Sequence, residues 1–374
     1  MTVSLKWPQV HAWRLTQHHL QQRAEPRQLL DVVTHIGGVQ AQLMSAAEVA
    51  LWARVDNLAA AGVEDALWRE RSLIKTWVMR GTLHLIAATD LPLYVAARAA
   101  YTINRPPSYY RYHGVTPDEL DAIIEAIPQV LGDVPLTREQ LAEAVAERAG
   151  SPNLREVLLS GWGALLKPSA FRGDICFGPN QGQNVTFVLP GRWAGEWAPL
   201  EPQPAIQDVA RRYLQAYGPA TTDDFARWFG LTAGQAKKVF RSLGDEIAAV
   251  DVEGWPAWAL TATLESLPGL DAAPVVRLLP HFDAYVLGVS RDCEPILAEA
   301  YKSRVYRPQG WISAVVLVDG RLEGVWTYDR QGDQVTVQVE MFAPPAAGVK
   351  RGVKAEAERL GDFLNTKVML VWER

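Results

Sequence analysis

The sequence predicts an α+β fold in which three tandem winged helix-turn-helix units are followed by a C-terminal β-barrel-like domain. Helix-start signals recur before Ala273, and each group of helices precedes two β-rich runs joined by a turn. The groups repeat at about 80 to 90 residues, which is typical of tandem copies of one unit. From Ala273 the pattern changes to alternating or fully apolar runs. The predicted domains are residues 1–112, 113–198, 199–268 and 269–374.

The first unit is predicted from three helix signals and a hairpin. Pro26 opens a helix that Gly37-Gly38 ends, and the SAAE segment at Ser45 to Glu48 forms a capping box that starts the next helix. A third helix is expected in VEDALWRER. The run SLIKTWVMRGTLHLIA has β-rich halves on either side of Arg80-Gly81, which predicts a hairpin. Three short helices followed by a hairpin form a winged helix.

The second and third units show the same order of signals. TPDE from Thr116 is a capping box with proline at the first helical position, and TREQ from Thr137 is another capping box. A helix in PNLREVLLSGWGALL and a hairpin in ICFGPNQGQNVTFVLP complete the second unit. The third unit runs from PAIQDVARRYLQAYG to the hairpin IAAVDVEGWPAWAL.

The C-terminal part is predicted to be a small barrel or a strongly curved sheet covered by one helix. Five runs have strand patterns, and Asp-Gly and Gln-Gly-Asp turns separate some of them. The amphipathic helix is expected in VKRGVKAEAERLGDFL. The segment TLESLPGLDAAP is rich in Pro, Gly and small residues and is interpreted as the linker into this domain.

Composition narrows the class of protein. With 374 residues, 41.4 kDa and 48% hydrophobic residues, the chain is expected to fold into several packed units. It begins without a signal-peptide core and contains no run near the ~20 apolar residues of a membrane span. We therefore expect a soluble cytoplasmic protein. Cys176 and Cys293 stand far apart with no ligand spacing, which predicts buried or free thiols and no zinc site.

The common catalytic motifs are absent from the sequence. There is no phosphate loop of the G-x-x-x-x-G-K-[ST] type, no G-x-G-x-x-G after a strand and no G-x-S-x-G elbow. Kinases, nucleotide hydrolases and serine hydrolases are therefore disfavoured. His18 and His19 are neighbours whose side chains diverge on a helix or a strand, so they do not predict a metal site. No cofactor is expected.

A net charge of −5 means that any DNA binding must come from local basic patches. The third helix of the third unit carries Lys237, Lys238 and Arg241, where a recognition helix would face a groove; a solvated helix face is the equal alternative. The remaining predicted phosphate contacts are Lys75 and Arg80 on the first hairpin, and Lys350, Arg351 and Lys354 at the start of the final helix.

The segment HFDAY places His281 two residues before Asp283. On a strand the two side chains would share one side and could form a proton-transfer pair. The alternative is an aspartate that fixes a turn or satisfies a buried histidine.

Two amides flank Ala41 in GGVQAQLMSAAE. On a helix Gln40 and Gln42 would point about 200° apart, whereas an extended or turn conformation would place both on one side. The double glycine before them and the capping signal after them favour the second case. The simpler alternative is that both amides hydrogen-bond nearby backbone in a surface loop, and the residue types alone do not establish chemistry.

The runs THIGGVQAQ, LIKTWVMRGTLHLIAATDL and LLPHFDAYVLG, followed by the β-rich end, resemble the bacterial winged-helix DNA glycosylases of the AlkZ and YcaQ family. The resemblance implies three tandem winged helices around a C-terminal β-barrel, and Gln40-Ala41-Gln42 corresponds to the family's Gln-Φ-Gln motif, where Φ is apolar. His84 in the second run, and His281 and Asp283 in the third, are secondary candidates.

What the resemblance implies is a monomeric, monofunctional DNA glycosylase that excises alkylated purines such as N7-alkylguanine and unhooks interstrand crosslinks in double-stranded DNA. Gln40 and Gln42 would then hold the attacking water. An aspartate at position 42, the family's other form, would be a stronger base, so the glutamine leaves the breadth of substrate range open. A winged-helix transcription regulator and a non-catalytic lesion-binding protein are the alternatives.

Overall fold

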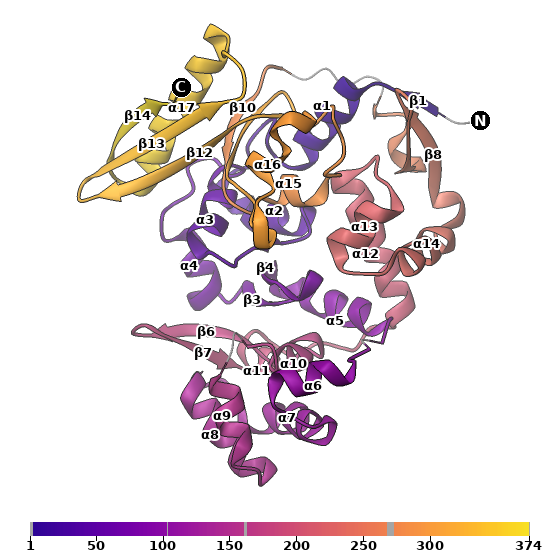
Figure 1. The fold of residues 1–374 in the computed structure, drawn as a ribbon, viewed down its shortest axis with the longest axis vertical. Helices are drawn as coiled ribbons and strands as arrows, with labels where there is room; N and C mark the ends of the chain where they lie inside the picture. Colours follow the sequence, from indigo (N-terminus) through magenta and orange to yellow (C-terminus); the bar gives the residue numbers. More distant parts are fainter. Residues whose placement is uncertain (1–2, 103, 161–162, 268–272, 374) are drawn as a thin grey trace. The chain divides into compact units, whose positions relative to one another are not determined.

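The computed structural model describes residues 3–102, 104–160, 163–267 and 273–373. Its chain divides into two compact units, one formed by Met1–Val63 with Ala210–Arg374 and the other by Glu64–Val209 (Figure 1). The second unit is therefore inserted into the sequence of the first. The four predicted domain boundaries do not coincide with this division and stay a prediction. Part of the predicted linker, residues 268–272, lies outside the described residues.

The N-terminal segment of the first unit is mostly helical. Its elements are β1 (Val3–Leu5), α1 (Trp7–Gln17), a 3-10 turn (Pro26–Gln28), α2 (Leu29–His35), β2 (Val39–Gln40) and α3 (Met44–Trp52). The predicted helix from Pro26 is confirmed, although its first turn is a 3-10 turn. The third predicted helix is a short α-helical turn, α4 (Gly62–Glu64), that continues as a π-helix over Asp65–Arg69.

The second unit contains two hairpins, both of which the sequence predicted. Its strands are β3 (Leu73–Trp77), β4 (Leu83–Ala87), β5 (Leu136–Thr137), β6 (Cys176–Gln181) and β7 (Asn184–Val188). β3 and β4 pair antiparallel, and β6 pairs with β7 beside β5. Arg80 and Gly81 turn the first hairpin with φ of 55° and 67°. Glycine adopts this left-handed region without strain, whereas arginine is uncommon there.

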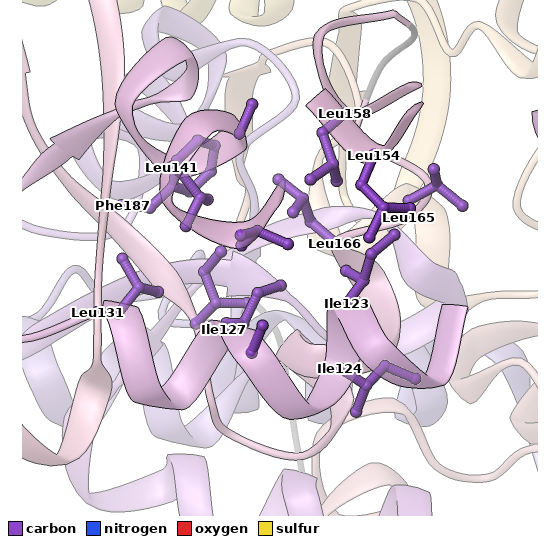
Figure 2. Close-up of a cluster of buried hydrophobic side chains, with 14 of the residues drawn as sticks. Ile123, Ile124, Ile127, Leu131, Leu141, Leu154, Leu158, Leu165, Leu166 and Phe187 are labelled. Carbon is purple, nitrogen blue, oxygen red and sulfur yellow. The ribbon is translucent and has the colours of Figure 1, made fainter. Parts of the chain in front are cut away.

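Helices of the second unit pack their apolar stripes around one core (Figure 2). The contributing helices are α6 (Pro107–His113), α7 (Pro117–Val130), α8 (Arg138–Ala149), α9 (Asn153–Leu159) and α10 (Lys167–Phe171), and the unit also contains α5 (Leu91–Ala99) and α11 (Pro190–Trp193). On α7, Leu120, Ile123, Ile124 and Ile127 recur at helical spacing and are buried. The predicted capping boxes at the starts of α7 and α8 are both confirmed. α9 is shorter than predicted, and residues 161–162 lie outside the described residues.

The third predicted group of helices and its hairpin are present. The elements are α12 (Pro202–Tyr217), α13 (Thr222–Phe229), α14 (Ala233–Ser242), β8 (Ile247–Val252) and β9 (Trp255–Leu260). β8 pairs antiparallel with β9 and parallel with β1. Three groups of helices each followed by a hairpin thus occur in the chain, and the assignment of each as a winged helix stays a prediction.

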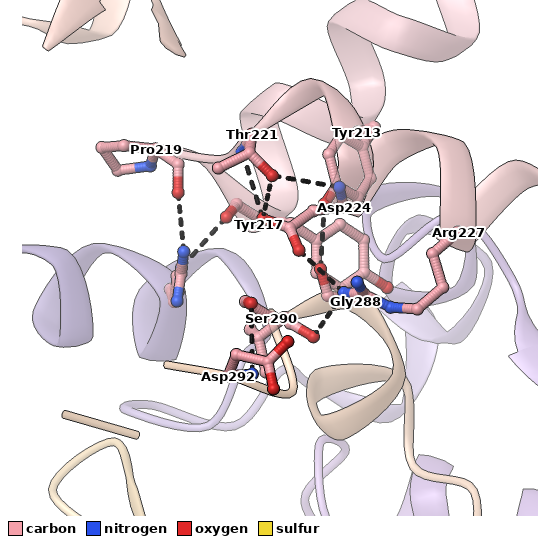
Figure 3. A network of polar contacts seen from close by, with 11 residues as sticks. Tyr213, Tyr217, Pro219, Thr221, Asp224, Arg227, Gly288, Ser290 and Asp292 are labelled. Carbon is pink, nitrogen blue, oxygen red and sulfur yellow. Dashed lines mark hydrogen bonds and ion pairs between the residues drawn. The ribbon is translucent and has the colours of Figure 1, made fainter. Parts of the chain in front are cut away.

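A buried polar network joins α12 and α13 to neighbouring segments of the first unit (Figure 3). The Arg14 guanidinium on α1 donates to the carbonyl oxygens of Tyr217 at 3.0 Å and Pro219 at 2.6 Å. Arg227 donates to Asp224 and to the carbonyl of Val289, both at 2.8 Å. These bonds satisfy donors that would otherwise be costly to bury. They fix the helical part of the unit against the segment that follows α15.

The C-terminal part forms an open five-stranded sheet in the order β10-β11-β12-β13-β14 within the described residues. The elements are β10 (Val276–Leu279), α15 (Ala284–Gly288), α16 (Lys302–Val305), β11 (Val315–Val318), β12 (Arg321–Gln331), β13 (Gln334–Met341), α17 (Ala347–Leu364) and β14 (Lys367–Trp372). All five predicted strands, the Asp-Gly turn at Asp319-Gly320 and the covering helix are confirmed.

Of the two predicted forms, a small barrel or a strongly curved sheet covered by one helix, no closed barrel is found among the residues that the structure describes. β14 pairs parallel with β13, so the chain must cross over the sheet between them, and α17 makes that crossing. α17 packs against both edge strands, β10 and β14. A Cβ added to Gly352 would lie 2.7 Å from Val276, and one added to Gly361 would lie 2.5 Å from Val368. The helix therefore lies close against both edges, which do not pair with each other.

Candidate active site

The double glycine redirects the chain between α2 and β2. Gly37 and Gly38 have φ of 72° and 98°, a region that other residues adopt only with strain. The Gly38 N–H donates to the Val33 carbonyl at 2.8 Å, a bond typical of a Schellman helix end. The two glycines thus end α2 and lead the chain into an extended segment.

The two amides that follow differ in exposure. Gln40 is the last residue of β2 and is only 7% exposed, whereas Gln42 lies exposed in the bend before α3. Ala41 between them is fully buried. The simpler interpretation of the sequence placed both amides in a surface loop, and for Gln40 this is not what the structure has. The segment presents one buried and one solvent-exposed amide.

α3 starts two residues earlier than the sequence predicted. Its first residue is Met44, its N-cap is Leu43, and no side chain caps it. The predicted capping box at Ser45 to Glu48 is therefore wrong. Ser45 lies in the first turn, and its side chain is hydrogen-bonded to Tyr328 of β12. Burial raises the pKa of Tyr328, whose phenol therefore stays protonated at neutral pH.

A pocket of about 280 Å³ opens beside the start of α3. This volume is near the lower end of the range typical of small-molecule sites. α3 and the residue before it supply one wall, the turn before α15 supplies another, and β12 supplies aromatic side chains. The lining residues are Leu43, Ser45, Ala46, Val49, Pro280, His281, Ala314, Trp326, Thr327 and Tyr328. The pocket thus begins at the residue that follows Gln42.

His281 and Asp283 do not form the predicted pair on a strand. His281 lies in a turn and Asp283 is the N-cap of α15, accepting from the Tyr285 N–H at 2.9 Å. His281 Nδ1 lies 3.0 Å from the Ile312 carbonyl oxygen and 3.1 Å from the Ala314 nitrogen. Asp283 therefore fixes a turn, as the alternative interpretation proposed. His281 is held by backbone groups at the pocket wall.

The sequence did not single out Arg54, which is the partner of Asp283. Both side chains are fully buried, and two bonds of 2.8 and 2.7 Å join Arg54 Nη1 and Nη2 to the carboxylate. Arg54 follows α3 and also donates to the Ala50 carbonyl. The pair therefore ties the end of α3 to the turn that carries His281. The one feature of the sequence that could have indicated this buried ion pair is the position of the arginine within the apolar run VALWARV.

The predicted DNA-contacting cations lie in both units. Lys237, Lys238 and Arg241 are exposed on α14, and Lys350 and Arg351 are exposed at the start of α17. Lys354 of α17 lies 3.6 Å from Glu358.

In the second unit, the Lys75 ammonium lies 5.2 Å from the ring centroid of Phe177. Arg80 Nη2 lies 3.4 Å from His84 Nε2. Contact of these cations with DNA stays a prediction.

His84 is buried on β4, and burial together with the Arg80 charge lowers its pKa to about 3. In the unfolded chain this histidine has its ordinary pKa of 6.5 and is protonated below that pH, whereas in the folded protein it stays neutral down to about pH 3. The protein therefore has its full stability with respect to this group above pH 6.5 and loses stability as the pH falls towards 3. We expect His84→Asn to remove this loss, about 1.4 kcal/mol per pH unit below the unfolded pKa. Urea unfolding at pH 7 and pH 5 tests it. An unchanged pH dependence in His84→Asn would contradict the assignment.

No cluster of His, Cys, Asp and Glu suited to a metal ion occurs among the described residues. Cys176 and Cys293 are buried free thiols, and burial raises the pKa of both. No described helix is long and apolar enough to cross a membrane.

Comparison with known proteins decides the family. The family model described as DNA glycosylase AlkZ-like matches residues 33–363. The chain belongs to the AlkZ-like DNA glycosylase family. Over 328 residues it is 40% identical to the interstrand DNA cross-link repair glycosylase of Streptomyces sahachiroi, covering 86% of this chain and 87% of that protein. The solved structure of Streptomyces sahachiroi DNA glycosylase AlkZ matches with a TM-score of 0.86 and 36% identity over 99% of this chain and 100% of that one.

Membership in the AlkZ-like family confirms the resemblance found in the sequence and the α+β fold. It also identifies DNA as the substrate and glycosylase chemistry as the activity. Gln40-Ala41-Gln42 lies inside the matched region. The roles of the two amides stay a prediction.

Proposed function

We propose that the protein is a DNA repair glycosylase that hydrolyses the N-glycosidic bond of alkylated purines such as N7-alkylguanine and unhooks interstrand crosslinks. The observation that carries the proposal is that Gln40-Ala41-Gln42 leads into α3, whose first turn lines a partly aromatic pocket. The 40% identity to a cross-link repair glycosylase supports the choice of substrate.

The chemistry of the substrate suits neutral amides. An N7-alkylated guanine already carries a positive charge, so it leaves as a neutral base without a strong acid. The barrier then lies in stabilising an oxocarbenium-like sugar. Exposed Gln42 would hold the attacking water, and buried Gln40 would supply a fixed amide dipole that is already ordered before the reaction.

A crosslinked base is tethered to the opposite strand and cannot leave the helix stack freely. The protein must therefore bring its amides to the lesion within the duplex. Exposed cations such as those on α14 would hold the phosphates around it. We propose that one chain acts as a monomer on each lesion.

The test is release of free base from defined duplexes that carry N7-methylguanine, a bulky N7 adduct or an N7 crosslink. With enzyme in excess and EDTA present, we expect all or part of this panel to yield free base. The DNA strands that have lost a base should then break only after alkali treatment. Breakage without alkali would instead show a lyase step. Tight binding with no release would indicate a lesion-binding protein, and preference for an undamaged palindrome would indicate a transcription regulator.

A further inference from the structure

Three cations of the unit Glu64–Val209 have no acidic partner. Arg98 on α5, Arg105 before α6 and Lys167 at the start of α10 are half-buried. Within the described part of the chain, no Asp or Glu forms an ion pair with any of them, and Arg98 Nε has no hydrogen-bond partner. The ion pairs described for this unit join other residues, namely Arg69 with Asp65, Arg155 with Glu143 and Arg172 with Asp174.

Two of these cations lie over aromatic rings, and the third is on the same helix as one of the rings. The Arg98 guanidinium lies 5.0 Å from the ring centroid of Phe171, which is one helical turn after Lys167 on α10. The charge of Arg105 is close enough to lower the pKa of Arg98. Arg105 in turn lies 5.8 Å from the ring centroid of Tyr109. Three elements of the unit thus contribute to a single cationic cluster.

The cluster adjoins the turn of the β3–β4 hairpin. A Cβ added to Gly81 would lie 3.5 Å from Phe171 Cζ, 3.7 Å from Lys167 Cδ and 3.9 Å from Lys167 Nζ. Gly81 follows Arg80, one of the predicted phosphate contacts. Lys167 also lowers the pKa of His113, after the larger effect of burial. The hairpin turn therefore lies beside Lys167 and Phe171 of this cluster.

The cations of this cluster have aromatic neighbours but no carboxylate among the described residues to balance their charge. Burial lowers the pKa of both Lys167 and Arg98, which shows that their charged forms lose solvation without compensation from a carboxylate. A DNA duplex supplies regularly spaced phosphates along a surface, which suits three cations contributed by separate elements.

We propose that Arg98, Arg105 and Lys167 bind neighbouring phosphates of the DNA duplex, extending the contact made by the β3–β4 hairpin. The proposal rests on the proposed function because it takes duplex DNA as the ligand. Lys167 would act as a compact charge beside the turn, and the two arginines would offer forked donors to phosphate oxygens.

The test measures binding to an undamaged duplex by fluorescence anisotropy over a series of salt concentrations. For the double variant Lys167→Gln, Arg105→Gln, we expect the slope of log Kobs against log salt to become shallower by about 1.8, since each phosphate contact contributes about 0.9. At 0.15 M salt this corresponds to roughly 30-fold weaker binding. The control is Arg155→Gln, which removes one positive charge from a residue of the same unit that is paired with Glu143.

A melting temperature equal to or above that of the parent is expected for the double variant, because an unpaired half-buried charge is removed. If the cations had only a structural role, the melting temperature would fall and the slope would not change, which would overturn the proposal. Equal slope changes in the double variant and in Arg155→Gln would also overturn it. Should the double variant not fold, Arg105→Gln alone must reduce the slope by about 0.9, and Lys167→Arg must retain the parent slope.

Excision is measured separately with saturating enzyme on an N7-methylguanine duplex, where the control Arg155→Gln should match the parent. If the parent itself released no base, the proposed function would fail, while the salt slopes would still decide whether this cluster binds DNA.

Discussion

Replacing Gln40 or Gln42 by alanine should abolish release of N7-alkylguanine while binding to the same duplex survives. Each amide contributes an oriented dipole in the proposed reaction, and loss of one preorganised polar group typically costs about 10²- to 10³-fold in rate. The double variant should therefore fall below detection. Single-turnover release of free base measures the rate, and anisotropy measures binding.

The two single variants should differ in stability, because the side chains of Gln40 and Gln42 differ in solvent exposure. Gln42 is exposed, so Gln42→Ala should leave the melting temperature unchanged. Gln40 is 7% exposed, and its truncation leaves a cavity, so Gln40→Met is the better variant because it keeps the volume while removing the amide. Gln42→Asp should retain release, because a carboxylate can hold the water and stabilise positive charge. The matched control is Gln334→Ala, at an exposed position at the start of β13.

Full release of base by the variant Gln40→Ala, Gln42→Ala would eliminate the assigned roles. Loss of release together with loss of binding would instead indicate that the amides hold DNA. A fall in melting temperature for Gln40→Met would show that the buried amide serves the fold.

Features encoded by a few adjacent residues could be predicted from the sequence. The capping boxes at Thr116 and Thr137 need only four residues each, and both form as predicted. The turn at Asp319-Gly320 is equally local, since the residues themselves permit φ of 49° and 88°. Gly37-Gly38 belongs to the same class, because the left-handed backbone it allows is what ends α2.

Features that depend on distant partners could not be predicted. Ser45 has the residue type of a cap, yet its side chain is bonded to Tyr328, far away in the sequence. For HFDAY the sequence offered an aspartate that fixes a turn, but it did not indicate that Asp283 pairs with Arg54, 229 residues away. The open sheet follows from the parallel pairing of β13 with β14, which strand patterns alone do not specify. The pocket beside Gln42 combines four separate stretches of the chain.

Breaking the buried ion pair between Arg54 and Asp283 should destabilise the first unit strongly. Asp283→Ala leaves the Arg54 cation without a carboxylate in a site with no solvent exposure, which typically costs about 3–5 kcal/mol. The same substitution removes the cap of α15. Asp283→Asn separates these effects, because asparagine can still accept from the Tyr285 N–H but carries no charge. Urea unfolding measures the free energy of unfolding for each variant.

The variant Arg54→Met, Asp283→Asn should recover most of the stability lost by Asp283→Asn, since removing both charges together avoids an unpaired buried ion. The exposed pair Arg155–Glu143 is the matched control, and Arg155→Gln should change stability by less than about 1 kcal/mol. An Asp283→Ala protein within about 1 kcal/mol of the parent would contradict the prediction. Because the pair joins the end of α3 to the turn of His281, the recovered double variant also tests function. If it folds but releases base slowly, the ion pair holds the pocket beside Gln42 in its active shape.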